Sequence, residues 1–428
     1  MRCPAACIAA AVLLAAAILA SAPLHASAAG PIEVSEEFPL LGSGTDGGIQ
    51  GQPHAAWGGG TYLAVWREGW HGKGGGARIL AARVSPGGRV ADARGIEVAP
   101  HSDRVQERPR AAFCGGVFLV VWQELVNGKD YDVLAARVTH DGRVLDAPPI
   151  RIAGGPHNQV LPEVASDGKT FLVVWQAVQG EETAYRGFAA VVDADGKVGP
   201  PVETGAAPQP KIAWNGRAYL AAYGMHSVES VILGSDGRRL VPGPRGTETI
   251  RSTKPAAFSL TGLPGRGWLV IGHRAPPDPW GWGGPGAMRA ALLDNEGRLE
   301  NGDAVKEPAG NWQRLPGWLD VGREKKPGAT WPWGVSACAW TGKYVLAVWP
   351  RHHLGGEKFT NLENCDLLAA RLDGYRSLDE AGIPLAAGPG DETRPALASD
   401  GAGRLLCIYE NHDRAGRDLV AACMVSVP

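Results

Sequence analysis

One short apolar segment recurs seven times along this 428-residue chain. Each copy is a nearly continuous run of Val, Leu and aromatic residues, which is typical of a strand buried on both faces. The copies are YLAVW (62–66), FLVVW (118–122), FLVVW (171–175), YLAAY (219–223), WLVIG (268–272), VLAVW (345–349) and LLCIY (405–409). Their last residues lie 56, 53, 48, 49, 77 and 60 positions apart. Recurrence at this spacing predicts a repeat protein, with one copy in each unit.

Further features accompany each copy and indicate how a unit is built. A glycine-containing turn precedes the apolar strand, as in SDGKT (166–170). A third strand follows a variable polar stretch, as in VLAARV (133–138), and a more polar fourth strand such as RGIEVAP (94–100) completes most units. A proline begins the segment before each copy: Pro53, Pro109, Pro162, Pro210, Pro255, Pro332 and Pro395. Glycine-containing turns such as SDGKT join antiparallel strands, so each unit is predicted to be a four-stranded antiparallel sheet.

Seven such sheets predict an all-β chain folded as a seven-bladed β-propeller of four-stranded antiparallel blades. The content of 60 Gly and 33 Pro agrees, because these residues are the poorest helix formers. The last unit stops after its third strand, whereas GPIEVSEE (30–37) reads like a fourth strand. We therefore expect this N-terminal strand to complete the last blade and remove its open edge. A β-helix or an open array would need no such complement.

The pattern resembles a repeat of secreted bacterial β-propellers, with [FY]-L-V-V-W followed by A-A-R-V-x-x-D-G-x-V-L-D. The resemblance covers essentially the whole mature chain; residues 109–154 match it best, and the fourth and fifth units match it least. It implies a secreted or surface-associated propeller. The activity of the family is not uniform, so the resemblance assigns no catalytic residue.

The N-terminus predicts export. Arg2 precedes an apolar stretch from Ile8 to Ala20, and Ala26-Ser27-Ala28 fits a signal peptidase site. Residues 1–28 are predicted to be a signal peptide and 29–428 a single propeller domain, secreted or periplasmic or held at the cell surface. A retained signal anchor is the alternative. No later segment is long and apolar enough to span a membrane. A net charge of −2 gives no basis for nucleic-acid binding.

Five cysteines remain after cleavage, so at least one thiol would stay unpaired: Cys114, Cys338, Cys365, Cys407 and Cys423. Cys407 and Cys423 fall on neighbouring predicted strands, where either a disulfide or two small buried side chains would fit. None of the five lies at a metal-ligand spacing. We expect no metal and no cofactor, and a monomer.

Functional residues are expected on one face of the ring. Loops between second and third strands, together with the connections between blades, surround one end of the central channel; we call this the channel-mouth face. Its loops are longer and more polar than the turns opposite, and rigid scaffolds commonly carry function on such loops. The candidate binding residues are Arg67, His71, His273, Arg274, Trp280, Trp282, Trp312, Arg351, His353 and His412. The alternative is that these loops are polar only because they are solvated.

Tryptophan suggests the chemistry of a ligand. Six Trp outside the repeated strands cluster between residues 280 and 333, around an insertion at about 311–334. Aromatic platforms beside charged groups suit stacking on sugar rings. The same side chains would also suit a small core that anchors the insertion.

No catalytic motif is present: there is no GxSxG, HExxH, P-loop or Cys/His zinc spacing. The first hypothesis is therefore an exported binding or scaffold protein that recognises a glycan or another extracellular polymer. The second is a polysaccharide-active propeller enzyme, a glycoside hydrolase or lyase, with His and carboxylate groups converging at the mouth. A propeller that binds a protein partner is the third. The sequence leaves open whether the chain is an enzyme.

Overall fold

The structure is a computed structural model. It describes residues 30–41, 48–69, 76–179, 184–205, 209–224, 228–240, 255–274, 287–300, 313–314, 336–354, 362–374, 376–379 and 382–428. The expected signal peptide and all but two residues of the insertion at 311–334 lie outside these ranges. No helix in the described part of the chain is long and apolar enough to cross a membrane.

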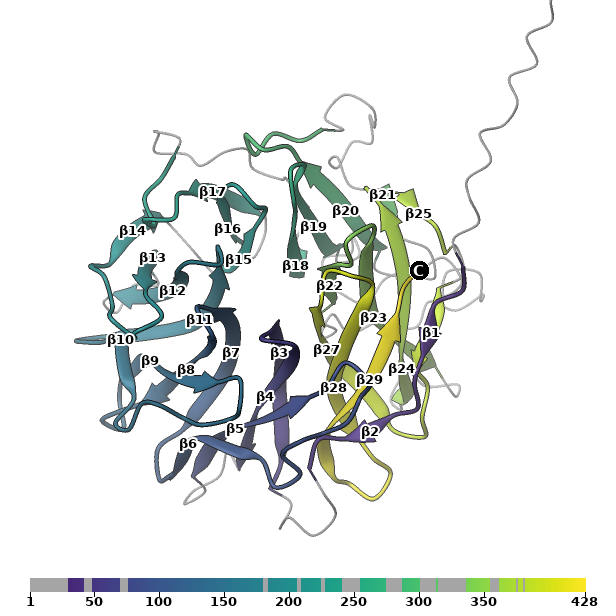
Figure 1. The fold of residues 1–428 in the computed structure, drawn as a ribbon, viewed down its shortest axis with the longest axis horizontal. Coiled ribbons are helices and arrows are strands. Elements are labelled where there is room, and N and C mark those ends of the chain that lie inside the picture. Colours follow the sequence, from purple (N-terminus) through teal and green to yellow (C-terminus); the bar gives the residue numbers. More distant parts are fainter. Residues whose placement is uncertain are drawn as a thin grey trace, which may run out of the picture.

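The described strands form seven antiparallel blades arranged in a ring (Figure 1), and a single parallel pair between Cys365 and Asp391 joins the last two blades into one sheet. Blade 1 contains β3 (Gln50–Gly58), β4 (Thr61–Gly69), β5 (Ala77–Val84) and β6 (Ile96–Ser102), and blade 2 contains β7 (Gln106–Cys114), β8 (Val117–Leu125), β9 (Tyr131–Thr139) and β10 (Ile150–Ala153). Blade 3 contains β11 (Asn158–Ser166), β12 (Phe171–Gln179), β13 (Ala184–Val192) and β14 (Val202–Gly205). Three described strands form blade 4: β15 (Lys211–Trp214), β16 (Tyr219–Tyr223) and β17 (Glu229–Leu233).

The second half of the ring repeats this order. Blade 5 contains β18 (Pro255–Leu263), β19 (Gly267–Arg274), β20 (Ala287–Leu293) and β21 (Gln313–Arg314). Blade 6 contains β22 (Ala337–Trp340), β23 (Val345–Leu354), β24 (Leu362–Asp373) and β26 (Ile383–Ala386), with the short β25 (Arg376–Ser377) beside β24. Blade 7 contains β27 (Asp391–Ser399), β28 (Arg404–His412) and β29 (Asp418–Ser426), completed by β1 (Glu33–Val34) and β2 (Phe38–Pro39).

The first strand of each blade lies innermost, and these strands touch one another in chain order until β27 contacts β3. The ring is therefore closed, and the seven-bladed propeller predicted from the repeats is confirmed. Each repeated apolar strand lies second in its blade and packs against the neighbouring blades. Trp66, Trp122, Trp268 and Trp349 are fully buried there.

The N-terminal closure is confirmed as well. β1 and β2 both pair with β29, so the last blade receives its outer strand from the start of the chain. Blade 6 holds the same segment from the other side, because Arg371 Nη1 donates to the carbonyl oxygen of Gly30 at 2.7 Å. Pairing β29 in this way leaves no exposed strand edge at the junction.

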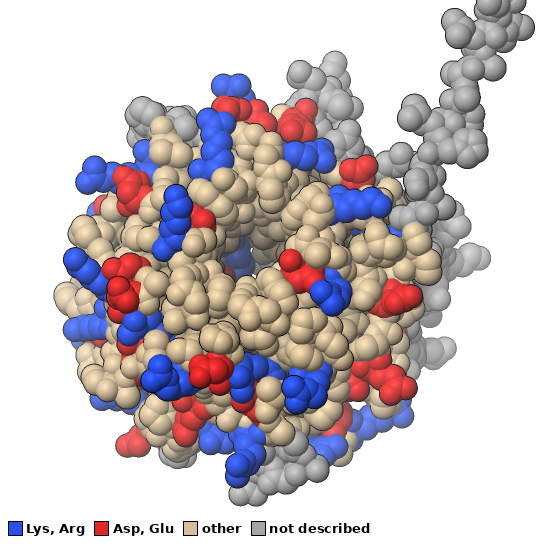
Figure 2. Space-filling model, viewed as in Figure 1, with Lys and Arg blue, Asp and Glu red and all other residues tan. Residues whose placement is uncertain are grey.

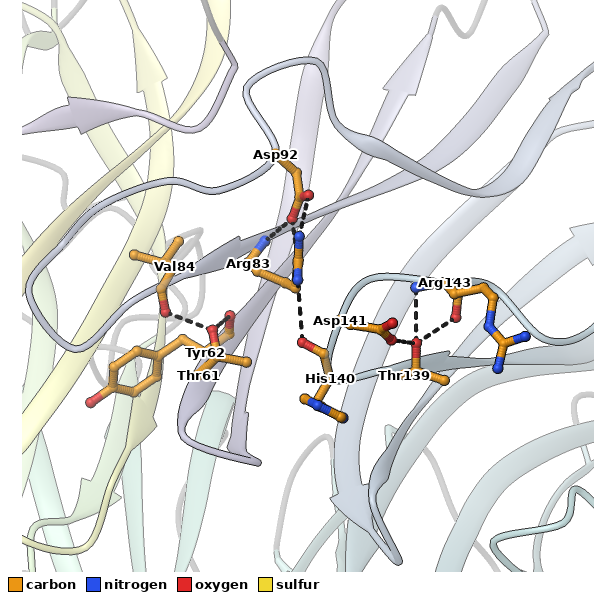
Figure 3. Close-up of polar contacts among 9 residues, drawn as sticks. All are labelled: Thr61, Tyr62, Arg83, Val84, Asp92, Thr139, His140, Asp141 and Arg143. Atoms are coloured by element: carbon orange, nitrogen blue, oxygen red, sulfur yellow. Dashed lines mark hydrogen bonds and ion pairs between the residues drawn. The ribbon is translucent and has the colours of Figure 1, made fainter.

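The Arg and Asp of the A-A-R-V-x-x-D-G-x-V-L-D repeat join neighbouring blades on the face opposite the mouth. Arg83 of β5 is bound by both carboxylate oxygens of Asp92, and its Nη1 donates to the carbonyl oxygen of His140 in blade 2 (Figure 3). Blade 2 repeats the arrangement, with Arg137 bound to Asp146 and to the carbonyl oxygen of Ala194 in blade 3. The charged residues of the repeat are therefore structural.

Four of the recurring prolines have a different place from the one predicted, whereas Pro255 does begin its innermost strand. Pro53, Pro109, Pro162 and Pro395 do not begin the innermost strands; each lies at a bulge inside one, where the ladder with the second strand skips two residues. The residue before the proline adopts positive φ: Gln52, Arg108, Leu161, Gln209 and Arg394 have φ between 48° and 57°. Because proline has no N–H to donate, it fits a position that the ladder leaves unpaired.

The five cysteines in the described part of the chain are free thiols. Cys407 and Cys423 are directly opposite each other on β28 and β29, and both are buried. They occupy core positions as small apolar side chains, which is one of the two outcomes that the sequence left open.

Candidate functional site

Each bulge lies close to the channel-mouth face. Gln50, at the start of β3, pairs with Glu68 near the end of β4, so innermost strands enter the sheet where second strands leave it. The left-handed backbone turns the N–H of the bulged residue toward the preceding blade. The bulged residue and the residue after the proline therefore lie near the start of each innermost strand, close to the mouth of the channel.

A polar side chain of the preceding blade accepts a hydrogen bond from four of these N–H groups, those of Gln52, Arg108, Leu161 and Gln209. Leu161 N donates to Gln123 Oε1 at 2.9 Å, and Gln209 N donates to Gln176 Oε1 at 3.1 Å. Gln123 and Gln176 directly follow the repeated Trp, so these residues fix the next blade rather than facing a ligand.

The junctions on either side of blade 1 use other acceptors for the same purpose. Gln52 N donates to Glu410 Oε1 of blade 7 at 2.7 Å. At the next junction the position after Trp66 is Arg67, which has no acceptor atom. Gln52 Oε1 accepts from Arg108 N at 2.6 Å instead. Gln52 thus connects blades 7, 1 and 2.

The first group of charged side chains at the bulges centres on Glu163 of blade 3. Glu163 Oε1 accepts from Arg110 Nε of blade 2 at 3.0 Å and also contacts Lys211 Nζ of blade 4. Burial alone would raise the pKa of Glu163, but Arg110 and Lys211 lower it to about 2. One carboxylate therefore holds two cations from the neighbouring blades, and it stays ionised at every physiological pH.

A second group lies on blade 7. Glu410 Oε1 accepts from Arg394 Nη1 at 3.2 Å, in addition to Gln52 N. His412 is placed between two carboxylates, with Nδ1 at 2.6 Å from Asp418 Oδ1 and Nε2 at 3.6 Å from Glu410 Oε2. The interaction with Glu410, reinforced by Asp418, raises the pKa of His412 to about 9. His412 is therefore protonated at neutral pH.

Arg108 differs from the other cations of the channel. Its side chain is exposed and has no hydrogen bond or ion pair with the described residues. Although water reaches the side chain, the protein atoms around it partly desolvate the guanidinium group, which lowers the pKa of Arg108; the positive charges of Arg110 and Arg394 lower it further, and Glu107 acts in the opposite direction. Since Arg394 comes from blade 7 and Arg110 from blade 2, cations of two blades act on Arg108. Figure 2 shows charged side chains inside the central opening.

His54 of blade 1 directly follows its proline, as Arg110 does in blade 2 and Glu163 in blade 3. Its Nδ1 accepts from Ala111 N at 3.2 Å. Burial, together with Arg110, lowers the pKa of His54 to about 3, so the imidazole is neutral.

The residues predicted for the site fall into three classes. Arg67 is buried, and its Nε and Nη2 lack a hydrogen-bond partner among the described residues. Burial lowers the pKa of Arg67, and Glu107 and Tyr131 act electrostatically in the opposite direction. Arg351 is half-buried on β23, and His412 lies at the rim beside Glu410. Only the strand positions of His273, Arg274 and His353 are described, and His71, Trp280, Trp282 and Trp312 lie outside the described residues. Ligand binding by these ten residues stays a prediction.

The charged residues beside the bulges were missed by the sequence reasoning. The signal was present, because the recurring proline is flanked by charge in Arg108-Pro109-Arg110, Pro162-Glu163, Pro210-Lys211 and Arg394-Pro395. The proline was used only to mark where a strand begins, so its neighbours were not considered. Within the described ranges, no three His, Cys, Asp or Glu side chains gather as a metal ion would require.

No protein-family model and no curated protein matches the chain. Solved structures resemble it at low identity. A protein of unknown function from Dyadobacter fermentans is 10% identical, with 93% of this chain and 99% of that chain covered and a TM-score of 0.43. A Trypanosoma rangeli sialidase is also 10% identical, with 79% and 56% covered and a TM-score of 0.43. A GH43_1 enzyme from Xanthomonas citri, complexed with xylotriose, is 13% identical, with 63% and 95% covered and a TM-score of 0.38. At these values the likeness concerns the arrangement of strands and indicates no activity.

Proposed function

We propose that this chain is an exported propeller that binds a glycan or another extracellular polymer at the channel-mouth face. The observation that carries the proposal is the position of Arg108 at the mouth, where charged groups of blades 2, 3 and 7 act on it. On the opposite face, Arg83 and Arg137 are saturated by carboxylates and by carbonyl oxygens of the next blade. At the mouth, Arg108 is held in place by its backbone N–H while its guanidinium group has no described partner. A rigid position with unused donors is suited to a ligand.

The protonation states favour binding over catalysis. A general acid or base works best when its pKa lies near the operating pH. His54, with a pKa of about 3, and His412, with a pKa of about 9, are both far from neutrality. Glu392 has a pKa raised to about 7 by burial, Asp366 and Glu37, but its side chain has no exposed surface through which to meet a substrate. The polysaccharide-active enzyme is therefore the second hypothesis.

The proposal is tested by screening the mature chain, residues 29–428, against neutral and acidic polysaccharides. Two variants identify the face: Arg351→Ala with His412→Ala at the mouth, and Arg89→Ala with Arg143→Ala opposite. We expect at least one polymer to bind, with a dissociation constant raised about fivefold or more by the mouth variant and unchanged by the other. Failure to bind any polymer, or loss only in the second variant, would contradict the proposal.

Two further measurements accompany this screen. Release of reducing ends from any bound polymer would replace the binding hypothesis with the enzymatic one. Fractionation of cells that produce the full chain should recover a product that begins near residue 29 outside the cytoplasm, because residues 1–28 are proposed to direct export.

A further inference from the structure

The bulges place more positive than negative charge around the channel mouth. The four cations on the innermost strands are Arg108, Arg110, Lys211 and Arg394. The carboxylates that pair with them are Glu163, bound to Arg110 and Lys211, and Glu410, bound to Arg394. Glu107, the residue before Arg108, also acts on its charge, so four positive groups face three negative ones and leave a surplus of one positive charge. Because like charges confined near one another repel, this surplus favours an anion.

The unpaired donors of this group are close to one another. Gln52 Oε1 accepts from Arg108 N, and Gln52 N donates to the same Glu410 oxygen that binds Arg394. Gln52 therefore lies between the two arginines. Its side-chain carbonyl oxygen is engaged by the Arg108 backbone N–H, so the NH2 group of the same amide is the donor that Gln52 can offer a ligand.

The positions of these donors are fixed by backbone rather than by side-chain packing alone. Gln52, Arg108 and Arg394 all have positive φ at a bulge, and the first two have their N–H groups bonded to a neighbouring blade. Guanidinium groups bind planar oxyanions through paired N–H donors, and a preorganised arrangement loses less entropy on binding.

We propose that Arg108, Arg394 and Gln52 bind an oxyanion of the ligand, and that the ligand is an acidic polysaccharide carrying carboxylate or sulfate groups. Arg110 and Lys211 contribute through their positive charge, since Glu163 holds both in place. This inference rests on the proposed function and narrows its ligand class. It involves residues of three blades, so the site exists only in the closed ring.

The test compares polymers that differ in charge but not in backbone. Polygalacturonate is compared with its fully methyl-esterified form, and dextran sulfate with dextran, at constant ionic strength by isothermal titration calorimetry. The mature chain should bind at least one acidic polymer at least tenfold more tightly than the neutral counterpart, and the affinity should fall as salt is added. The two pairs distinguish a carboxylate from a sulfate ligand.

Three variants connect binding to this site. Arg108→Gln and Arg394→Gln should each raise the dissociation constant about tenfold or more, and Arg108→Lys should retain part of the affinity. Arg143→Gln is the matched control, because this exposed arginine lies on the opposite face beside Thr139 (Figure 3). Arg108 has no described side-chain partner, so Arg108→Gln should leave the Tm unchanged and separates lost binding from lost folding.

The outcomes separate this inference from the proposed function. Equal affinity for acidic and neutral polymers, or unchanged binding in Arg108→Gln and Arg394→Gln, would overturn the oxyanion site and leave glycan binding standing. If no polymer binds, digalacturonate and inorganic sulfate are titrated in their place. Binding of either that depends on Arg108 would uphold the site while the glycan hypothesis fails, and absence of binding would overturn both.

Discussion

At the scale of single residues, Glu392 is a carboxyl group whose pKa is raised rather than lowered by its surroundings. It lies on β27 with no exposed surface, and no cation pairs with its carboxylate among the described residues. Burial, together with the negative charges of Asp366 and Glu37, raises its pKa from 4.5 to about 7. A protonated carboxyl is the form that such surroundings favour.

This shift predicts how stability depends on pH. Because the folded state binds the Glu392 proton more tightly than the unfolded state, the resulting stabilisation is complete below pH 4.5 and is lost as the pH rises toward 7. Glu392→Gln keeps the shape without the charge. We expect its Tm to match the wild type near pH 4 and to exceed it at pH 8, by the equivalent of about 2 kcal/mol.

Thermal unfolding of both proteins across this pH range provides the measurement. His412 also has a raised pKa, of about 9, so its contribution is lost at higher pH and is common to both proteins. Parallel curves of Tm against pH for the two proteins would contradict the prediction, because they would show that folding does not change the pKa of Glu392.

At the scale of elements, the junction between two blades depends on one side chain after the repeated strand. Gln176 Oε1 accepts from the backbone N–H of Gln209, and blade 7 uses Glu410 in the same way toward Gln52. A buried N–H that loses its acceptor costs more than the hydrogen bond itself contributes.

We therefore expect Gln176→Ala to lower the free energy of unfolding by about 1–2 kcal/mol. Gln176→Glu keeps an acceptor, as Glu410 does naturally, and should lie within about 0.5 kcal/mol of the wild type. Urea denaturation measures both. Equal losses in the two variants would mean that the acceptor atom is not what stabilises the junction.

At the scale of the whole molecule, stability depends on the pairing of β1 and β2 with β29. Without residues 29–39, β29 would present an open edge and Arg371 would lose the carbonyl oxygen of Gly30. An unpaired edge strand recruits other chains.

Deletion of residues 29–39 should therefore lower the Tm by more than 10 °C and produce oligomers in size-exclusion chromatography with light scattering. Arg371→Gln is the milder comparison: it removes the contact to Gly30 and weakens the bond to Asp379 while β1 and β2 still pair, so it should destabilise without oligomerisation. A monomeric truncated protein with an unchanged Tm would contradict this role for the closure.

The architecture was predictable because each blade is encoded by the same local pattern of strands and turns, repeated along the sequence. Burial of the second strand on both faces requires continuous apolar runs, and the missing strand at the C-terminus is matched by 30–37 at the N-terminus. The site was less accessible to this reasoning. The polar loops were chosen as candidate sites because loops commonly carry function. The charged residues beside Pro109 and Pro395 lie within predicted strands, so the sequence did not distinguish them from other strand residues.

The sequence by itself determined the number of blades, the order of their strands and the closure, since these follow from hydrophobic periodicity within each unit. Only the tertiary structure decided which polar residues are structural and which are unsatisfied. Arg108 and Arg394 belong to units at opposite ends of the chain, and they meet because the ring closes through blade 1. The bulge at each proline fixes their backbone, while the partners that neutralise Arg83 and Arg137 lie in the same repeat. Charge balance across a channel is a property of the closed ring, which no single repeat contains.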